Sequence, residues 1–526
     1  MSIPSKSGRV FLVGAGPGAP DLITIRGAEL IRSADVIVYD NLVAYATLRL
    51  ARDGAELIYA GKKGGASGNV PQTEINRILI EQAQRGRRVV RLKGGDPFIF
   101  GRGGEEAEAL RAAGIEYEIV PGVTSAIAVP AFAGIPLTHR EHGSFVTILT
   151  GHLDRFKDAK AAIPWTDLAR AADGRGTIVM LMGTAQLRDN LDHLVKGGMA
   201  ESTPASAIQW GTTASQRSVV GTLVNLADEV ERARLGAPAV VVVGECAALG
   251  NQLIWYERMP LFGRRIIVTR AAEDASGLIE RLRAMGGEVI GVPVIEAAPP
   301  PSYAVLDKAI GEVGAFDWII FTSAKGVDAF MQRIKTLRCD IRELGKAAIA
   351  AIGPATAARV EDYALTVAAM PSEYRAERLI DALTPERIKG ARILIPRAKA
   401  AREVLQQMLR EAGAQEVVIA PAYSTIRPEA VAREHLRGLI ESAEIDLVTF
   451  TSPSTVTNWI ELAGEAGKRF KAAVIGPITA EAARAQGLDV VVEAETYTVD
   501  GLVAAIEKHY IEGKMNAARS EPSSPQ

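Results

Sequence analysis

The chain lacks an excess of charge of either sign. Its 526 residues include 60 Lys and Arg against 62 Asp and Glu, which gives a formal net charge of −2. Proteins that bind nucleic acid through the phosphates usually carry a strongly basic surface, and this composition gives no sign of one. We therefore expect no nucleic-acid partner.

Cysteines and long apolar runs are also scarce. Cys246 and Cys339 stand far apart without a CxxC motif, which argues against both a disulfide framework and a zinc site. The most apolar stretch, 237–250, is interrupted by Glu245 and is too short to span a bilayer. Residues 1–8 lack the apolar core of a signal peptide. These absences predict a cytoplasmic protein with no membrane partner.

The pattern along the chain predicts an α/β protein with largely parallel sheets, because short β-rich apolar runs alternate with amphipathic helical segments. At this length three or four compact units are expected. The spacing predicts a helix over 24–33 and a major boundary near 258–262. Predicted strands cover 9–13, 35–39, 145–149, 177–181, 239–243 and 265–269.

The most informative stretch is 93–106, which holds five glycines and one proline in fourteen residues. It follows the strand-like segment 88–92. Glycine reaches positive φ at low cost and lets other groups approach the backbone, so this pattern indicates a ligand loop at the carboxyl end of a strand. An ordinary glycine-rich loop is the alternative.

An internal repeat occupies the region after the boundary. Its matching segments are 264–270 with 391–397, 321–323 with 450–452, and 353–357 with 476–480, at offsets of 127, 129 and 123 residues. Two proline-bearing crossings, 293–301 and 421–428, occupy the same phase of the two repeats. This pattern predicts two similar lobes, hinged about a cleft.

Several motifs of the first half resemble those of the uroporphyrinogen-III C-methyltransferases, the tetrapyrrole branch of the class III methyltransferases. They are Val13 to Gly18 with Asp21 to Thr24, Tyr39 to Val43, Gly61 to Lys63, the loop at 93–106, Pro121 to Ala126, Gly134 to Arg140, Thr150 to His152, and Gly211 to Thr213. The resemblance implies a methyltransferase domain over 8–258, with subdomains of about 8–140 and 144–258. It also implies S-adenosylmethionine as methyl donor and a homodimer formed through this half.

The same resemblance implies a donor pocket. Its expected residues are Pro17, Gly94, Gly95, Asp96, Ile99, Thr124, Ser125, Met182, Gly211 and Ala239. The pair Gly14 and Gly16 also invites a dinucleotide-binding interpretation, but Ala19 stands where GxGxxG requires its third glycine. We therefore rank NAD binding far below the methyl donor.

Substrate and proton-transfer residues follow from the resemblance as well. Asp40 and Lys62 match positions with acid-base roles, although spacing alone favours a helix cap and a solvated lysine. Candidates for binding the substrate carboxylates are Lys63, Arg102 and Arg140. His139 and His152 are interpreted as hydrogen-bonding residues, so no metal is expected.

The second half resembles uroporphyrinogen-III synthase through Phe-Thr-Ser strand ends, Ile-Gly-Pro-x-Thr turns and the segment 496–501. The resemblance implies a synthase domain over 262–512, with lobe one at 262–297 plus 427–512, lobe two at 298–422, and no cofactor. Substrate-binding candidates are Thr322, Ser323, Thr451, Ser452 and Thr479. Tyr423 is the catalytic candidate, and a tyrosine packed between the lobes is the equally weighted alternative.

Together the two resemblances imply a bifunctional enzyme. It would cyclise hydroxymethylbilane to uroporphyrinogen III and methylate that product twice to precorrin-2, on the route to siroheme or cobalamin. Alternatives are a class III methyltransferase acting on a diphthine precursor or ribosomal RNA, and a second half that binds a tetrapyrrole as a non-catalytic sensor. Residues 513–526 are expected to form a disordered tail.

Overall fold

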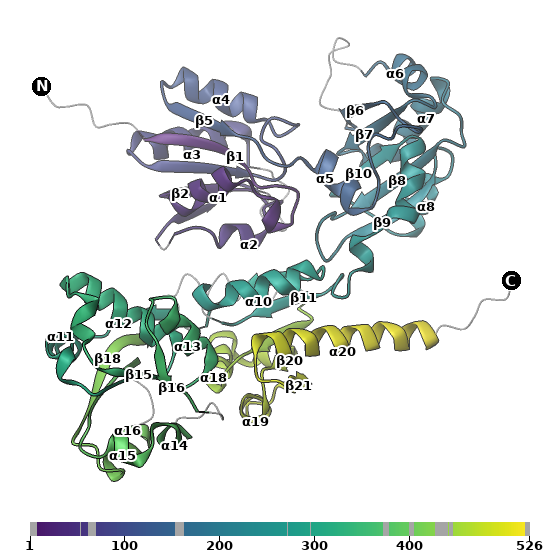
Figure 1. The fold of residues 1–526 in the computed structure, drawn as a ribbon. Coiled ribbons are helices and arrows are strands. Elements are labelled where there is room, and N and C mark those ends of the chain that lie inside the picture. The colour runs from purple at the N-terminus through teal and green to yellow at the C-terminus, as the bar shows by residue number, and fades with distance from the viewer. Residues whose placement is uncertain are drawn as a thin grey trace, which may run out of the picture.

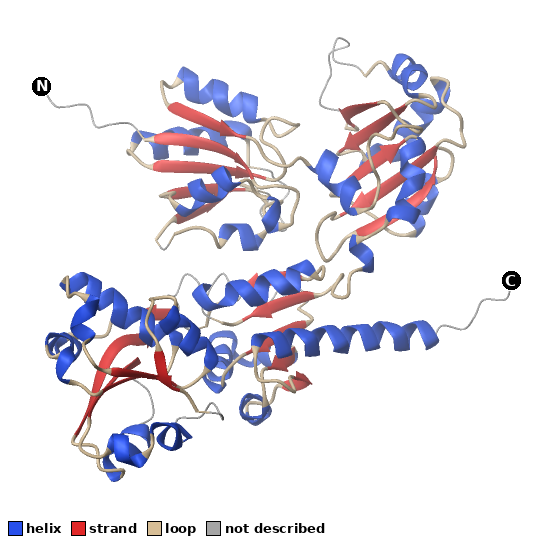
Figure 2. Ribbon diagram, viewed as in Figure 1, coloured by secondary structure: helices blue, strands red, loops and turns tan. Residues whose placement is uncertain are grey.

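Four sheets, each covered by helices, make up the protein. The computed structural model describes residues 8–52, 54–61, 70–152, 163–270, 272–294, 296–371, 378–398, 404–426, 440 and 445–520. Within these residues the strands form three five-stranded sheets and one six-stranded sheet. Figure 1 labels the elements, and Figure 2 shows the sheets lying between layers of helices.

The first sheet is parallel, with strand order β3-β2-β4-β1-β5. Its strands are β1 (Arg9–Gly14), β2 (Val36–Tyr39), β3 (Glu56–Tyr59), β4 (Arg88–Lys93) and β5 (Glu116–Val120), and its helices are α1 (Ile25–Arg32), α2 (Tyr45–Leu48), α3 (Gln72–Gln84) and α4 (Gly103–Ala112). Side chains alternate between the faces of β1, so Val10 and Leu12 pack with α3 and α4, whereas Phe11 and Val13 pack with α1 and α2.

The second sheet is mixed, with order β6-β7-β10-β8-β9 and only β6 and β7 parallel. Its strands are β6 (Phe145–Thr150), β7 (Gly176–Leu181), β8 (Pro204–Gln209), β9 (Arg217–Thr222) and β10 (Ala239–Val243), and its helices are α5 (Ser125–Phe132), α6 (Trp165–Ala172), α7 (Leu187–Lys196), α8 (Leu226–Arg232) and α9 (Gly250–Leu253). Helix α5 follows the last strand of the first sheet but packs through Ala126 and Val129 on the second. The connection from β5 to α5 therefore lies where the two units meet.

The third sheet is parallel, with order β12-β11-β19-β20-β21. Its strands are β11 (Arg265–Val268), β12 (Glu288–Gly291), β19 (Leu447–Phe450), β20 (Lys471–Val474) and β21 (Asp489–Glu493), and its helices are α10 (Ala272–Ala284), α18 (Pro453–Ala463), α19 (Pro477–Ala485) and α20 (Val499–Ser520). The sheet thus combines the first part of this half of the chain with the last part.

The fourth sheet has the order β13-β18-β17-β14-β15-β16, with β13 antiparallel to β18. Its strands are β13 (Glu296–Ala298), β14 (Trp318–Phe321), β15 (Ala348–Ala351), β16 (Val367–Ala369), β17 (Arg392–Ala398) and β18 (Glu416–Ile426), and its helices are α11 (Ala304–Gly311), α12 (Ala324–Leu337), α13 (Pro354–Glu361), α14 (Leu379–Leu383), α15 (Pro385–Ile388) and α16 (Val404–Glu411). Apart from β13, its order β18-β17-β14-β15-β16 repeats that of the third sheet strand for strand. In chain order, this sheet begins with β13 at Glu296.

The predicted fold class is confirmed, and each predicted strand is present within a residue or two of its expected bounds. The C-terminal end differs from expectation, because α20 continues to Ser520 and so enters the segment 513–526 that we expected to be disordered. Lys514, Met515 and Ala517 are good helix formers, which explains the extension. Among the described residues, no helix is long and apolar enough to cross a membrane.

Candidate active sites

Glycines at the carboxyl ends of β1, β4 and β5 bring the loops there into direct backbone contact. Gly95 and Gly16 exchange backbone hydrogen bonds of 2.7 and 3.3 Å. A Cβ on Gly122 would lie 2.3 Å from the carbonyl oxygen of Gly95 and 2.6 Å from Cα of Gly14, distances that real side chains do not adopt. The loops after the three strands are therefore fixed relative to one another without any side chain between them.

Asp96 shapes the glycine-rich loop after β4. Its Oδ1 accepts a hydrogen bond from the amide of Phe98 at 2.7 Å, and its Oδ2 accepts one from the amide of Gly122 at 2.9 Å. Sequence analysis expected Asp96 to contact a ligand, whereas here both oxygens bind the backbone. The loop so held leaves the next three apolar side chains, Phe98, Ile99 and Phe100, 40 to 49% exposed.

Gly95 provides open space at the base of this loop. Its φ is +69°, and a Cβ there would meet only the amide nitrogen of Ser125 at 3.6 Å and Cα of Thr124 at 3.9 Å. The Thr124 hydroxyl accepts a hydrogen bond from the amide of Ala126 and so caps α5. The amino end of a helix thus faces Gly95, an arrangement that favours a negatively charged group of a ligand.

The second sheet provides the opposite side of the candidate donor site. Ala239 at the start of β10 pairs with Gln209 at the end of β8, so the loops carrying Met182 and Gly211 begin at one edge of this sheet. Met182 is half exposed. A Cβ on Gly211 would collide with Val129, so this glycine is required by the packing of α5.

One hydrogen bond joins the loops at the facing ends of the first and second sheets. The amide of Ala19 donates to the hydroxyl of Thr212 at 3.1 Å, which places the loop carrying Pro17 beside the loop carrying Gly211. The residues expected to form the donor pocket therefore gather at the facing strand ends of the two subdomains. Sequence analysis named Thr212 only as part of the Gly211 to Thr213 motif, without a role, and did not consider Trp210, which is 40% exposed just before that motif.

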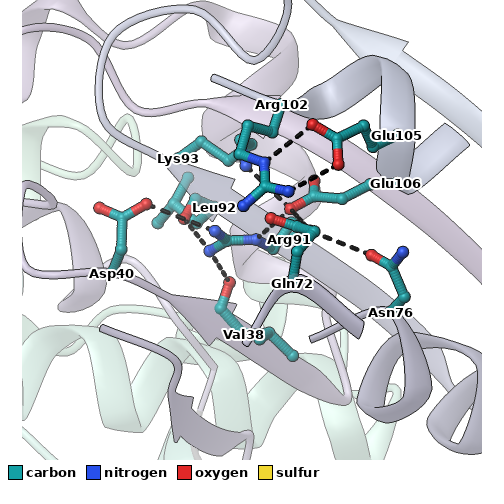
Figure 3. A network of polar contacts seen from close by, with 10 residues as sticks. All are labelled: Val38, Asp40, Gln72, Asn76, Arg91, Leu92, Lys93, Arg102, Glu105 and Glu106. Carbon is teal, nitrogen blue, oxygen red and sulfur yellow. Dashed lines mark hydrogen bonds and ion pairs between the residues drawn. The ribbon is translucent and has the colours of Figure 1, made fainter. Parts of the chain in front are cut away.

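Buried charges lie beneath the glycine-rich loop, as Figure 3 shows. The side chains of Arg91, Lys93 and Glu106 are at most 5% exposed. One oxygen of Glu106 accepts from Lys93 Nζ at 2.8 Å, from Arg91 Nε at 3.2 Å and from Gln72 at 3.2 Å. Arg91 also reaches Oδ2 of Asp40 at 3.5 Å, so Asp40 is connected to this cluster.

The cluster contains two cations around one fully buried carboxylate. Burial lowers the pKa of Lys93, the positive charge of Arg91 lowers it further, and Glu106 acts in the opposite direction. Glu106 is therefore the group that compensates for the cost of burying both cations. Sequence analysis did not single out these residues, because charges on a strand and a helix give no pattern in sequence that shows they meet.

Asp40 follows β2 and does not cap a helix, because α2 begins at Tyr45 with Ala44 as its N-cap residue. Its Oδ1 accepts from the amide of Leu42 at 3.1 Å, as in an Asx turn, while Oδ2 faces Arg91. Lys62 and Lys63 lie outside the described residues. Arg102 begins α4 at a φ of +59° and donates to both oxygens of Glu105 at 2.8 and 2.7 Å, so its guanidinium already has a carboxylate partner.

Arg140 is exposed and lies in a short turn with three possible metal ligands. The ligand atoms of His139, Glu141 and His142 lie within 4.8 Å of one another, a cluster that sequence analysis missed because it considered His139 and His152 only. Nδ1 of His139 accepts from the amide of Glu141 at 3.2 Å, and the two imidazoles stack. His139 and Gly143 also exchange backbone hydrogen bonds of 2.9 and 3.0 Å, so the turn itself brings these side chains together. The amide of His152 donates to Thr150.

In the second half, Ser323 and Ser452 occupy equivalent places after β14 and β19. Each hydroxyl caps the following helix, accepting from Gly326 at 3.1 Å and from Thr455 at 3.4 Å. Thr322 and Thr451 precede them and are partly buried.

Tyr423 of β18 reaches the same strand end as Ser323, with 3.2 Å between the two hydroxyl oxygens. The Tyr423 ring packs against the core of its own lobe, whereas the alternative placed it between the lobes. Thr479 is 3% exposed in the first turn of α19, which makes it the least accessible of the proposed substrate-binding residues.

Comparisons with known proteins agree with this architecture. The tetrapyrrole (corrin/porphyrin) methylase family model matches residues 9–227, and the uroporphyrinogen-III synthase HemD model matches residues 276–504. The chain is 36% identical to the porphyrin biosynthesis protein HemD of Ruminiclostridium josui over 94% of this chain and 97% of that protein. It is 40% identical to the uroporphyrinogen-III C-methyltransferase of Bacillus subtilis over 64% of this chain and 68% of that protein.

A solved structure is also similar in sequence. Uroporphyrin-III C-methyl transferase from Thermus thermophilus, complexed with S-adenyl homocysteine, is 36% identical and covers 46% of this chain and all of that one, with a TM-score of 0.39. On the sequence matches over both halves, the chain belongs to the family in which a tetrapyrrole methylase is fused to a uroporphyrinogen-III synthase.

The buried cluster predicts an asymmetry between two substitutions. Glu106→Gln removes the buried carboxylate that Arg91 and Lys93 share and leaves them the more distant Asp40 carboxylate, 3.5 Å from Arg91. We expect it to lower the free energy of unfolding by about 3 to 5 kcal/mol. Lys93→Met leaves the Arg91 and Glu106 pair balanced, so we expect a clearly smaller decrease in the free energy of unfolding. Urea unfolding of both variants measures the difference, and an equal or smaller loss in Glu106→Gln would contradict this account.

Proposed function

We propose that this enzyme closes hydroxymethylbilane to uroporphyrinogen III in its second half and methylates a tetrapyrrole with S-adenosylmethionine in its first half. Membership of the fused family supports both activities. The observation that carries the assignment of the donor site is the convergence of the strand ends around Gly95, facing the edge of the second sheet. Two methyl transfers to uroporphyrinogen III would give precorrin-2, for siroheme or cobalamin.

The residues around Gly95 fit the methyl donor. The open space at this glycine admits a ligand against the backbone, and the amide of Ser125 at the start of α5 suits the donor's carboxylate. The half-exposed side chains of Ile99 and Met182 offer apolar contacts. The donor supplies a methyl group on a sulfonium, which needs alignment with the attacking carbon more than acid catalysis.

Asp40 is assigned to the tetrapyrrole. Methylation of a pyrrole carbon creates a cation on the substrate, and the carboxylate of Asp40 would stabilise that charge or accept the proton that is later lost. Arg91 and the amide of Leu42 hold the two oxygens in place. Arg140, and Arg102 with an exchange of its Glu105 partner, would bind substrate carboxylates.

In the second half, the pair formed by Ser323 and Tyr423 is assigned to the departing hydroxyl of hydroxymethylbilane. In this proposal the Ser323 hydroxyl donates to the Tyr423 oxygen, and the Tyr423 hydroxyl donates its proton to the leaving group, which departs as water. The tyrosinate regains a proton when the closed ring loses one. Pyrrole nitrogen electrons expel the hydroxyl as the carbon to oxygen bond breaks. No cofactor is required in this proposal, because the enzyme folds the linear chain and excludes water.

Gly95→Val should weaken donor binding by about tenfold or more, because a β-branched residue is strained at positive φ and its side chain occupies the ligand space. Gly104→Val is the matched control, since a Cβ there meets no atom within 4 Å. Titration calorimetry with S-adenosylhomocysteine measures both variants. Unchanged affinity in Gly95→Val would remove the donor from this loop, and cyclisation should stay normal in either variant.

Asp40→Asn should lower the methylation turnover number by about a hundredfold while leaving donor affinity within about twofold, because asparagine keeps the hydrogen bond from Leu42 but loses the charge. Asp35→Asn is the control, because Asp35 precedes β2 as Asp40 follows it, and it binds the amide of Arg88 instead. Steady-state kinetics with uroporphyrinogen III tests both. A normal turnover number would leave Asp40 only the structural role of holding the turn at Leu42.

Tyr423→Phe keeps the packed ring but loses the hydroxyl, and we expect cyclisation to slow by about tenfold to a hundredfold with methylation unaffected. Tyr363→Phe in the same lobe removes a hydrogen bond of 2.9 Å to Asp328 and serves as control. Product isomers are separated after incubation with hydroxymethylbilane. If the wild-type chain binds this compound without forming the type III product, the sensor alternative is correct.

A further inference from the structure

The loop between β8 and β9 has an unusual backbone. Trp210 and Thr212 lie in the left-handed region with φ of +48° and +70°, which costs free energy for residues other than glycine. Such conformations persist where surrounding contacts enforce them. This loop carries Gly211 and the Thr212 hydroxyl that meets Ala19, so its shape affects the proposed donor site directly.

Contacts within the methyltransferase half hold the base of the loop. Gln216 accepts from the amide of Thr212 at 2.9 Å and donates to Glu257 at 2.9 Å and to the carbonyl of Phe132 at 3.3 Å. These bonds fix the base of the loop to the connection that leads into the second half.

Contacts from the second half hold the tip. Glu288 Oε2 accepts from the amide of Ala214 at 3.1 Å, and Arg265 Nη2 donates to the hydroxyl of Ser215 at 3.2 Å. Arg265 and Glu288 are neighbours on β11 and β12, joined by an ion pair of 3.0 Å. Tyr45 of α2 also packs against the core of this lobe, so the two halves meet at more than one place.

The other repeat contains an equivalent ion pair, with which the pair of Arg265 and Glu288 can be compared. Arg392 and Glu416 pair in the same register on β17 and β18, with 2.8 Å between Nε and Oε2. Arg392 also contacts Glu312 and the carbonyl of Ala315, both within its own lobe. The arginine and glutamate pair is thus a feature of the sheet that both lobes share, and in lobe one it additionally binds the loop of the methyltransferase half.

We propose that lobe one of the synthase half holds the loop between β8 and β9, which borders the proposed donor site. Glu288 and Arg265 would then be positioning residues for methyl-donor binding. They act through Ala214 and Ser215 on the strained segment 210–212. This inference depends on the donor site proposed above. By linkage, donor binding should in turn stabilise the contact between the halves.

The test compares Glu288→Ala with its repeat equivalent Glu416→Ala in the full chain, using titration with S-adenosylhomocysteine. We expect the donor Kd of Glu288→Ala to rise about fivefold, equivalent to about 1 kcal/mol, and that of Glu416→Ala to stay within about twofold. Both variants remove the same kind of pair, so thermal unfolding controls for general loss of stability. Glu288→Gln retains an acceptor for Ala214 and should restore most of the affinity.

Ser215→Ala provides a second test from the other half, because it removes the hydroxyl without altering the synthase lobe. It should raise the donor Kd about twofold, and hydrogen exchange at residues 210–216 should be faster in it and in Glu288→Ala. Equal Kd values for Glu288→Ala, Glu416→Ala and the wild type would overturn the inference while leaving the donor site intact. Failure of the wild type to bind would instead contradict the proposed function.

Discussion

The methyltransferase half depends on the contact between backbones at Gly14, Gly95 and Gly122. Three parallel strands end at this point, and a Cβ on Gly14 or Gly122 would collide with the facing backbone. The contact fixes the glycine-rich loop, and Asp96 then directs the loop outward by binding the amides of Phe98 and Gly122. The proposed donor site is thus a consequence of close packing at strand ends, with side chains added around it.

The buried charges beneath the glycine-rich loop connect it to Asp40. Glu106 satisfies Arg91 and Lys93 at the end of β4, and Arg91 in turn reaches Asp40 at the end of β2. A substrate cation formed near Asp40 would therefore face a carboxylate whose position is set by buried partners. Orientation that is fixed before the substrate arrives is the main way in which a protein lowers the barrier for such a transfer.

The sequence was sufficient for the fold class, the predicted strands and the internal repeat, because periodicity and local motifs encode them. It also located the glycine-rich loop. It could not show that Asp96 binds backbone amides, that Glu106 meets two cations, or that Glu288 reaches Ala214, since these contacts join segments far apart in the chain. The helix through Ser520 was missed because the composition of the last residues outweighed local helix propensity.

The central claim is that one chain carries out two activities in sequence. The most direct test is to incubate this chain with hydroxymethylbilane and with S-adenosylmethionine labelled on its methyl group. Mass spectrometry and isomer analysis of the product report on both halves at once. The account predicts a type III tetrapyrrole carrying two labelled methyl groups. A product consisting of unmethylated or type I tetrapyrrole alone would contradict it.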